Sequence, residues 1–201
     1  MINLHQYTHY FLQLFPSLHG LPPWDITASA SVHILDKIKT LSEDYIIRDH
    51  IAIHKEARIE EHVIIKGPAI ISAKCFIGAH AYLRGGVYLG EGVSIGPGCE
   101  IKTSFIMPRA SLAHFNFAGD SIIGSQVNME AGSVIANHYN ERTDKEIKVL
   151  VDGKTFETGA TKFGALVGDG TKIGANAVLS PGTILPLNSI VKRLELVEQV
   201  N

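Results

Sequence analysis

The chain has 201 residues, of which 45% are hydrophobic, and a formal net charge of −2. This length suffices for one domain with a sizeable core, and the near-neutral charge argues against nucleic acid or an anionic membrane as the main partner, because both attract a basic face. No apolar run approaches the length of a membrane span, and the opening MINLHQYTHYF lacks the basic start of a signal peptide. We therefore expect a cytoplasmic protein.

Residues 1–48 are expected to form a helical N-terminal cap. A first helix is predicted over residues 3–15, ending at Pro16 because proline restricts the residue before it. Its apolar positions recur at helical spacing and are Leu4, Tyr7, Phe11 and Leu14. A Pro-Pro pair then breaks the chain, and a second helix is predicted over residues 28–41. We expect these helices to cover the open lower end of the strand stack described next, where unpaired strand edges would attract other chains.

The stretch from Ile51 to Asn116 divides into eleven consecutive six-residue words without remainder. A period of six excludes an amphipathic helix, whose apolar stripe recurs every three or four residues. It indicates short strands separated by turns, which must stack because one unit cannot bury its own apolar face. The third positions of the words are apolar: Ile53, Ile59, Ile65, Ile71, Ile77, Leu83, Leu89, Ile95, Ile101, Met107 and Ala113. The sequence thus predicts an all-β fold, a parallel β-helix.

The same repeat defines the expected boundaries of the β-helix. After a four-residue break at 117–120, eight further words follow, three of them before a long excursion and five after it. Nineteen words correspond to about six coils at three words per coil. The β-helix domain is therefore expected over residues 49–194, with the excursion at 139–164 and a C-terminal tail at 195–201.

Within the excursion, the segments IKVLV and KTFET flank Asp152-Gly153, which is the strongest short signal for a β-hairpin. Excursions from a regular solenoid tend to line a binding face. Cys75 and Cys99 fall at inward positions of the repeat, so they are expected to be small buried residues and neither a disulfide nor zinc ligands.

One word of the repeat breaks its apolar pattern most clearly. His114 lies in SLAHFNFAGD among small residues instead of in a turn of charged ones. A lone histidine is more often structural than catalytic, but polar and charged residues accompany this one on neighbouring words. Because groups one coil apart stack vertically, we expect these residues to converge with His114 on one corner of the prism. They are Arg84, Glu100, Lys102, Asn128 and Asn137.

A resemblance to a known family rests on the segments AHFNFAGDSIIGSQVNMEAGSVIANHYNE, KFGALVGD and IGANAVLSPGTIL. They resemble the acetyltransferase half of the bifunctional sugar-1-phosphate nucleotidylyltransferase/acetyltransferases, which belong to the hexapeptide-repeat acyltransferases. The resemblance covers residues 24–191 and does not include the nucleotidylyltransferase half. A separate nucleotidylyltransferase is considered as a partner, but the sequence is silent on whether one associates with the chain. It implies a left-handed β-helix and a homotrimer with active sites between subunits. It also implies acetyl transfer from acetyl-CoA to the amine of glucosamine 1-phosphate, a step of UDP-N-acetylglucosamine biosynthesis.

The resemblance assigns a role to each candidate residue by its position in the family's motifs. His114 would be the catalytic base, Glu100 the acid that orients its imidazole, and Asn128 a further catalytic residue that contacts the substrate. The residues expected to bind the sugar phosphate are Arg84, Lys102, Phe117, Asn137 and Lys162. The residues expected to bind the cosubstrate are Ala131, Ala175, Lys192 and Arg193.

Two of these positions depart from the family's motifs. Phe117 stands where the family carries tyrosine, so a hydroxyl that would bind phosphate is missing, at a cost of roughly 1–3 kcal/mol. Glu130 replaces a small residue in VNMEAG, and a carboxylate close to a phosphate repels it. Glucosamine 1-phosphate is therefore the leading acceptor among several amino-sugar phosphates.

The reaction requires these residue types whatever the family. An ammonium is not a nucleophile, so a neutral imidazole must accept a proton as the amine attacks the thioester. A carboxylate on the other ring nitrogen fixes the tautomer, and a phosphate dianion needs several cations. The buried cysteines argue against a covalent acyl-cysteine.

The sequence leaves two alternatives from other classes open. One is a γ-class carbonic anhydrase, which has the same solenoid and trimer with three histidines around zinc. His62 and His80 lie one coil apart and fit this pattern, but a third histidine at suitable spacing is missing. His5 and His9 also lie one helical turn apart, but without a carboxylate a solvated face is favoured, and no metal site is predicted. The other alternative is a non-catalytic scaffold that keeps the solenoid for assembly.

Overall fold

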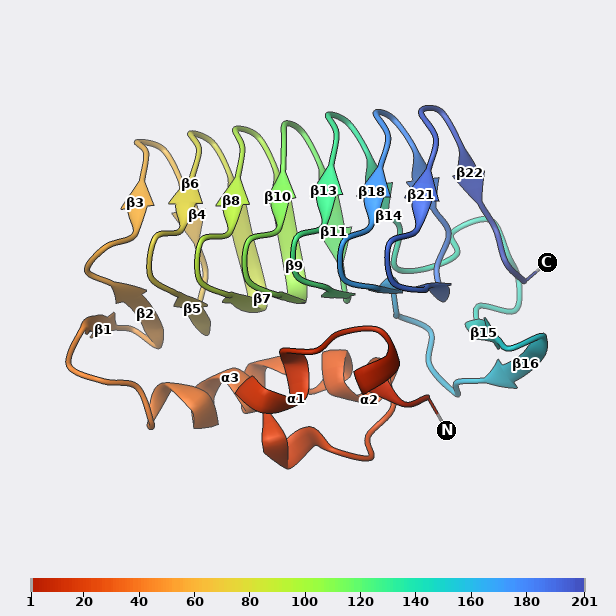
Figure 1. Ribbon diagram of the computed structural model, residues 1–201, viewed down its shortest axis with the longest axis horizontal. Coiled ribbons are helices and arrows are strands. Elements are labelled where there is room, and N and C mark those ends of the chain that lie inside the picture. Colours follow the sequence, from red (N-terminus) through yellow and green to blue (C-terminus); the bar gives the residue numbers. More distant parts are fainter. Residues whose placement is uncertain (1, 201) are drawn as a thin grey trace.

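The computed structural model describes residues 2–200 and contains a parallel β-helix with three faces (Figure 1). Each coil contributes one short strand to each face, and strands one coil apart pair in parallel, as Ile77 does with Ile95. Within the described residues each face holds seven strand segments, because β7 (Tyr82–Leu89) and β9 (Glu100–Ile106) turn a corner and contribute to two faces. The predicted all-β parallel β-helix is confirmed.

The three faces are defined here by their strands. Face 1 holds β2 (Ile51–His54), β5 (Ala69–Ile71), the second halves of β7 and β9, β12 (Ile122–Ile123), β17 (Ala165–Val167) and β20 (Thr183–Leu185). Face 2 holds β3 (Arg58–Ile59), β6 (Phe76–Ile77), β8 (Ser94–Ile95), β10 (Ser111–Leu112), β13 (Asn128–Met129), β18 (Lys172–Ile173) and β21 (Ile190–Val191). Face 3 holds β4 (Ile64–Ile65), the first halves of β7 and β9, β11 (Phe117–Gly119), β14 (Val134–Ile135), β19 (Val178–Leu179) and β22 (Leu196–Val197).

The seven coils exceed the predicted six, because two strands lie in segments that do not carry the repeat pattern. The expected break at 117–120 contains β11, which pairs with β9 and β14. Its inward residue is the small Ala118, where the paired strands carry isoleucine, so the apolar signal is weak. The expected tail at 195–201 contains β22, which pairs with β19 and continues face 3.

The interior of the prism is filled by the inward apolar residues of all three faces. Cys75 and Cys99 belong to this core, as predicted, and both are free thiols. The thiol of Cys75 lies 3.1 Å from the carbonyl oxygen of Gly90, and burial raises the pKa of Cys75 to about 12. A thiol in this environment stays protonated and unreactive at neutral pH.

The N-terminal segment forms two short 3-10 turns and three α-helices instead of the two predicted helices. The turns are Leu4–Gln6 and Pro16–Leu18, and the helices are α1 (Phe11–Leu14), α2 (Pro23–Ala28) and α3 (Ala30–Ile38). The predicted single helix over residues 3–15 is wrong because Asp169 interrupts it. The backbone N–H of Asp169 donates to the Tyr7 carbonyl at 2.8 Å, and its carboxylate accepts from the His9 N–H at 3.0 Å. None of the described helices is long and apolar enough to cross a membrane.

These helices cover face 1 and not the lower end of the solenoid, contrary to expectation (Figure 1). The reason is that the outward residues of face 1 are large and apolar: Ile70, Tyr88, Phe105, Ile122, Leu166 and Ile184. The Phe15 ring packs edge-on against Tyr88 at 5.0 Å and against Phe105 at 5.2 Å. Tyr88 and Phe105 are thus covered by the chain itself. The N-terminal edge of face 1 is formed by β1 (Tyr45–Arg48), which pairs antiparallel with β2.

Face 3 has a largely apolar outward surface that no element of the described chain covers. One residue of each strand forms a continuous column, in which only the third member is charged: Ile64, Tyr82, Glu100, Phe117, Val134, Val178 and Leu196. Ile64 is 55% exposed and Leu196 is 61% exposed. Residues 2–200 therefore leave one flat apolar face uncovered.

The excursion contains the predicted hairpin, formed by β15 (Lys148–Val151) and β16 (Lys154–Glu157). Asp152 and Gly153 have φ angles of 49° and 72°, as a tight two-residue hairpin turn requires. Figure 1 shows the hairpin beside the C-terminal coils, on the side of the molecule that carries the N-terminus.

Candidate functional site

The residues predicted to form one site lie at two different corners of the prism, on either side of face 3. The corner where face 3 meets face 1 carries Arg84, Lys102 and Asn137, and we call it the Lys102 corner. The turn that leads from face 2 to face 3 carries His114, and we call it the His114 corner. The predicted convergence on a single corner is therefore wrong within one chain.

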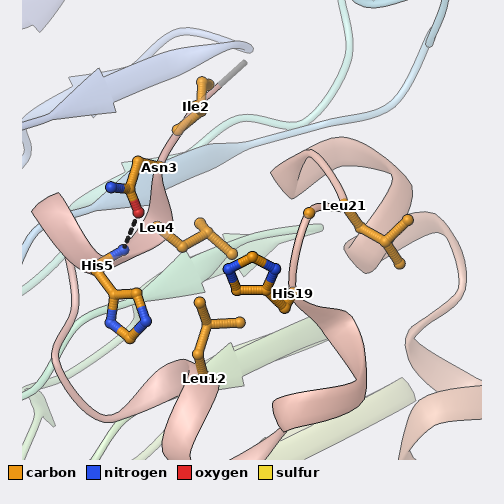
Figure 2. A pocket seen from close by; sticks show the side chains of 8 residues that line it. Ile2, Asn3, Leu4, His5, Leu12, His19 and Leu21 are labelled. Carbon is orange, nitrogen blue, oxygen red and sulfur yellow. Dashed lines mark hydrogen bonds between the residues drawn. The ribbon is translucent and has the colours of Figure 1, made fainter.

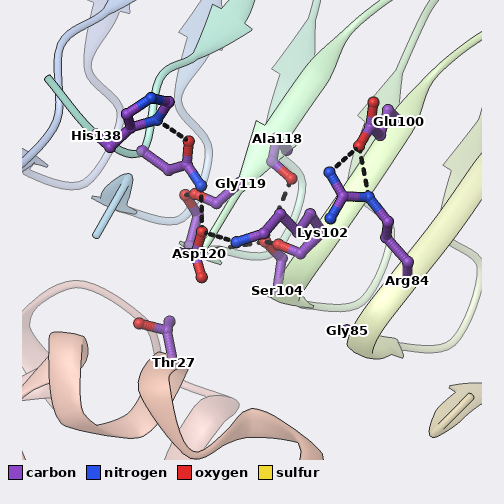
Figure 3. Close-up of polar contacts among 12 residues, drawn as sticks. Thr27, Arg84, Gly85, Glu100, Lys102, Ser104, Ala118, Gly119, Asp120 and His138 are labelled. Atoms are coloured by element: carbon purple, nitrogen blue, oxygen red, sulfur yellow. Dashed lines mark hydrogen bonds and ion pairs between the residues drawn. The ribbon is translucent and has the colours of Figure 1, made fainter. Parts of the chain in front are cut away.

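Side chains from three successive coils form a connected network at the Lys102 corner (Figure 3). The Lys102 ammonium lies 2.5 Å from the Asp120 carboxylate, and the Asn137 amide donates to the same carboxylate oxygen. The side-chain amide oxygen of Asn137 lies 3.3 Å from Nδ1 of His138. Because Asp120 is 5% exposed, this network is largely shielded from water.

Arg84 and Glu100 form a second pair at this corner. The guanidinium nitrogens lie 2.8 Å and 2.6 Å from Oε1 of Glu100, and both side chains are about one-third exposed. Glu100 was predicted to orient the His114 imidazole, but within this chain its carboxylate binds Arg84. The residue instead projects from face 3, between the two corners.

Asp120 is a member of the network that the sequence did not reveal. It follows β11 and lies one coil beyond Lys102, where its backbone N–H donates to the Lys102 carbonyl at 2.8 Å. Asp120 follows Lys102 by eighteen residues, the length of one coil, which is a sign that the two residues stack. Asp120 was overlooked because it lies in the segment 117–120, which was interpreted as a break in the repeat. A regular coil count through 117–120 would have identified it.

The excursion returns to the solenoid at the Lys102 corner. The N–H of Phe163 donates to the Asn137 carbonyl at 3.0 Å, and that of Gly164 donates to the Asp120 carbonyl at 2.9 Å. A side chain at Gly164 would collide with the carbonyl oxygen of Gly119, so this close return requires glycine. These contacts bring Lys162, whose side chain is exposed, next to the corner.

His114 stands by itself at the other corner. It is exposed, and no side-chain hydrogen bond or ion pair reaches its imidazole from within residues 2–200. Its backbone is fixed, because its carbonyl oxygen accepts from the Gly132 N–H at 2.8 Å. Phe117 lies on face 3 beside Glu100, and Asn128 lies on face 2, in register with Ser111.

The residues predicted to bind the cosubstrate occupy the His114 corner of the last coils, where Glu130 already engages two of them. Its carboxylate accepts two hydrogen bonds from Arg193, at 2.7 and 2.9 Å, and one from the backbone N–H of Ala175, at 2.9 Å. These hydrogen bonds lower the pKa of Glu130 to about 2, those from Arg193 contributing most. The carboxylate expected to repel phosphate is thus balanced by Arg193.

A shallow cavity of about 490 Å³ adjoins this group on face 2. Its charged and polar lining residues are Asn128, Glu130, Lys172, Lys192 and Arg193. Ala131 lies in the adjoining turn, where its carbonyl oxygen accepts from the Asn176 N–H at 3.0 Å. Three of these five side chains are cationic, which makes the cavity suited to an anionic ligand.

The histidines considered as metal ligands do not gather into a metal site. His5 and His9 are both exposed, and of the two only His5 lines the cavity of about 370 Å³ shown in Figure 2, where Leu4 and Leu12 lie beside it. His62 and His80 do stack one coil apart, with ring centroids 5.2 Å apart and an angle of 9°. In the part of the chain that the structure describes, no group of three His, Cys, Asp or Glu residues could hold a metal ion.

The sequence profile of the GMPPB C-terminal domain matches residues 65–200, which is more than half of the chain. The chain belongs to this family. The matched range includes most of face 3, and the residues described at the Lys102 and His114 corners lie within the family's domain. It excludes the N-terminal helices that cover face 1.

Two curated relatives combine two activities in one chain. A bifunctional sugar-1-phosphate nucleotidylyltransferase/acetyltransferase of Sulfurisphaera tokodaii is 40% identical over 84 residues, which cover 41% of this chain and 20% of the relative. The bifunctional protein GlmU of Methanocaldococcus jannaschii is 34% identical over 165 residues, which cover 80% of this chain and 40% of the relative. The chain thus spans less than half of either relative. Among solved structures, the acetyltransferase domain of PglB from Neisseria gonorrhoeae, in complex with acetyl coenzyme A, matches with a TM-score of 0.42 and 14% identity, covering 72% of this chain and 53% of that one.

Proposed function

We propose that the chain is an acetyltransferase that transfers the acetyl group of acetyl-CoA to the amine of an amino-sugar phosphate. Glucosamine 1-phosphate is the leading acceptor, and the product would enter UDP-N-acetylglucosamine synthesis in the cytoplasm, with a separate nucleotidylyltransferase as partner. The observation that carries the proposal is the placement of His114 and the Lys102 network at opposite corners of one uncovered apolar face. The similarity to bifunctional nucleotidylyltransferase/acetyltransferases supports the reaction type.

The arrangement of the corners supports a homotrimer as the active form. If face 3 of each of three parallel copies packs around a threefold axis, the apolar column from Ile64 to Leu196 is buried. In that packing the His114 corner of one copy meets the Lys102 corner of the next. Glu100, which projects from face 3, would then lie where it can reach the imidazole of a neighbouring copy.

The chemistry follows from the groups at the two corners. The His114 imidazole accepts a proton from the amine as the amine nitrogen attacks the thioester carbonyl carbon. The tetrahedral intermediate then collapses, the C–S bond breaks, and CoA leaves as thiol after taking a proton. Lys102, Arg84 and Lys162 would hold the sugar phosphate, and because two of them are paired with carboxylates, the phosphate must compete for those cations.

The cavity on face 2 would receive the phosphorylated end of acetyl-CoA. Lys172, Lys192 and Arg193 supply positive charge there, and Ala131 and Ala175 lie in the adjoining turns toward His114. Glu130 currently binds the Ala175 N–H and Arg193, so cosubstrate contacts to these groups require Glu130 to move aside.

The decisive experiment is a thiol-release assay with acetyl-CoA and glucosamine 1-phosphate, run beside galactosamine 1-phosphate and free glucosamine. We expect CoA release that depends on a sugar phosphate and falls by about 100-fold or more in His114→Ala, as for loss of a general base. His62→Ala is the matched control, because His62 is also an exposed histidine in a turn that leads from face 2 to face 3, four coils away from the cosubstrate cavity. Turnover that persists in His114→Ala would refute the proposed mechanism.

A second candidate function is a non-catalytic scaffold, and the pairing of the expected anion ligands favours it. Arg84 is paired with Glu100, Lys102 with Asp120, and Arg193 with Glu130. A scaffold would give neither CoA release with any acceptor nor a rise in melting temperature with acetyl-CoA. A rise in melting temperature without turnover would retain the cosubstrate site and point to another acceptor.

A further inference from the structure

A cavity of about 570 Å³ lies away from both corners, between the N-terminal segment and the β15–β16 hairpin. One wall is formed by Ile2, Pro22 and Trp24, and the other by Val151 and Phe156 of the hairpin. The volume lies within the range of small-molecule sites, roughly 300–1,000 Å³. Phe156 is 39% exposed although its strand partner, Val149, is fully buried, so the ring faces an open space.

The mouth of the cavity carries two charged groups of opposite sign that have no ion-pair or side-chain hydrogen-bond partner among residues 2–200. Glu157 is paired with Lys148 at 3.3 Å, which accounts for that carboxylate. Neither Asp152 nor Lys154 takes part in an ion pair or side-chain hydrogen bond with another residue in 2–200. Asp152 lies in the hairpin turn and Lys154 begins β16, and both line the cavity, so a ligand could engage the two charges at once.

We propose that this cavity binds a small aromatic molecule that carries both an N–H donor and an anionic group. The flat ring would pack between Trp24 and Phe156, because aromatic pairs gain from stacked and edge-on contacts beyond simple burial. Asp152 accepts the N–H hydrogen bond, and the Lys154 ammonium binds the anion. Purine mononucleotides and aromatic amino acids share this chemistry.

The cavity is separate from the cosubstrate region proposed above. It adjoins the hairpin and α2, on the side of face 1, whereas the cationic cavity lies on face 2. It nevertheless connects with the Lys102 corner, because Trp24 packs edge-on against Phe163 at 6.0 Å and Phe163 hydrogen-bonds the Asn137 backbone. An effect of the ligand on acetyl transfer would rest on the proposed function, but its binding does not.

The cavity contains the sole tryptophan of the sequence, so intrinsic fluorescence reports on it directly. We would titrate the protein with AMP, GMP and phenylalanine. Adenosine, which lacks the phosphate of AMP, tests the contribution of the anionic group to binding. The expected result is a saturable change in Trp24 fluorescence with either the nucleotides or the amino acid, which identifies the source. Inner-filter absorption is corrected with free tryptophan at equal concentration.

Matched variants decide whether the response arises in the cavity. Phe156→Ala should weaken binding by about tenfold or more, as for loss of one stacking partner, and Lys154→Ala should weaken binding of AMP but not of adenosine. Phe115→Ala is the control, because Phe115 is 73% exposed at the His114 corner and should leave the response unchanged. Melting curves establish that each variant is folded. The absence of a saturable response with every probe, or an equal response in Phe156→Ala, would overturn the proposal, whatever the outcome of the thiol-release assay.

Discussion

Removal of the Asp120 carboxylate should destabilise the fold strongly, because it breaks a largely buried ion pair. The Asp120 side chain is 7% exposed and that of Lys102 is 16% exposed, with 2.5 Å between the ammonium nitrogen and the carboxylate oxygen. The same carboxylate accepts from the Asn137 amide. In Asp120→Ala, the cation and the amide donor both lose their partner in a region with little access to water.

The expected loss follows from the cost of leaving a buried charge unpaired. Breaking a buried pair by removing one partner costs about 3–5 kcal/mol. For a protein of this size, about 2–4 °C is lost per kcal/mol, so the melting temperature of Asp120→Ala should fall by roughly 6–20 °C. Asp120→Asn should lose less, because the amide oxygen still accepts a hydrogen bond from Lys102.

The assay is thermal and urea denaturation followed by circular dichroism, with two controls. The double variant Lys102→Met/Asp120→Leu should recover most of the loss, because apolar replacement of a buried pair is often neutral. Glu91→Ala breaks the Lys74–Glu91 pair, which has a similar distance of 2.8 Å but is 66% and 59% exposed, and it should have little effect. Equal effects of Asp120→Ala and Glu91→Ala would refute the argument from burial.

Three further predictions concern other parts of the molecule. Glu130→Gly should lower the KM for acetyl-CoA with little change in the KM for the acceptor, because it frees the groups that Glu130 now binds; unchanged steady-state constants would contradict this. Val178→Asp on face 3 should yield monomers in size-exclusion chromatography with light scattering and abolish CoA release, whereas Ser94→Asp on face 2 should do neither. Burial lowers the pKa of His33, so the unfolded state binds a proton more readily than the folded state, and stability should fall as the pH drops below about 6.5. In His33→Phe, the melting temperature should therefore depend less on pH between pH 8 and 5 than in the wild type.

The sequence predicted the fold well because its signal is repeated in every coil. A six-residue period at the third word position requires stacked short strands, and the hairpin turn at Asp152-Gly153 requires only two residues. The errors occurred where one local signal was weak. Ala118 did not look like a core residue, although it pairs with Ile101 and Ile135.

The candidate site was harder to predict because coil registration decides which residues stack. Arg84 and Lys102 are eighteen residues apart and adjacent in register, whereas Glu100 and His114 are fourteen apart and fall at different positions of the coil. The predicted site residues have the expected chemical types, but they divide between the Lys102 corner and the His114 corner. Glu130 and Arg193 lie far apart in the sequence, and no local sequence pattern predicts that they pair.

The N-terminal helices determine which face of the prism remains available for a partner. All three faces of a solenoid are alike in backbone geometry, and here faces 1 and 3 both carry apolar outward columns. The chain covers face 1 with its own aromatic residues and fixes them through Asp169, which binds the backbone of Tyr7 and His9. Face 3 is then the apolar surface that the described residues leave uncovered, and it is the face that separates His114 from the Lys102 network. In the proposed trimer, a segment outside the family's matched domain would thus direct assembly toward the packing that brings the two corners together.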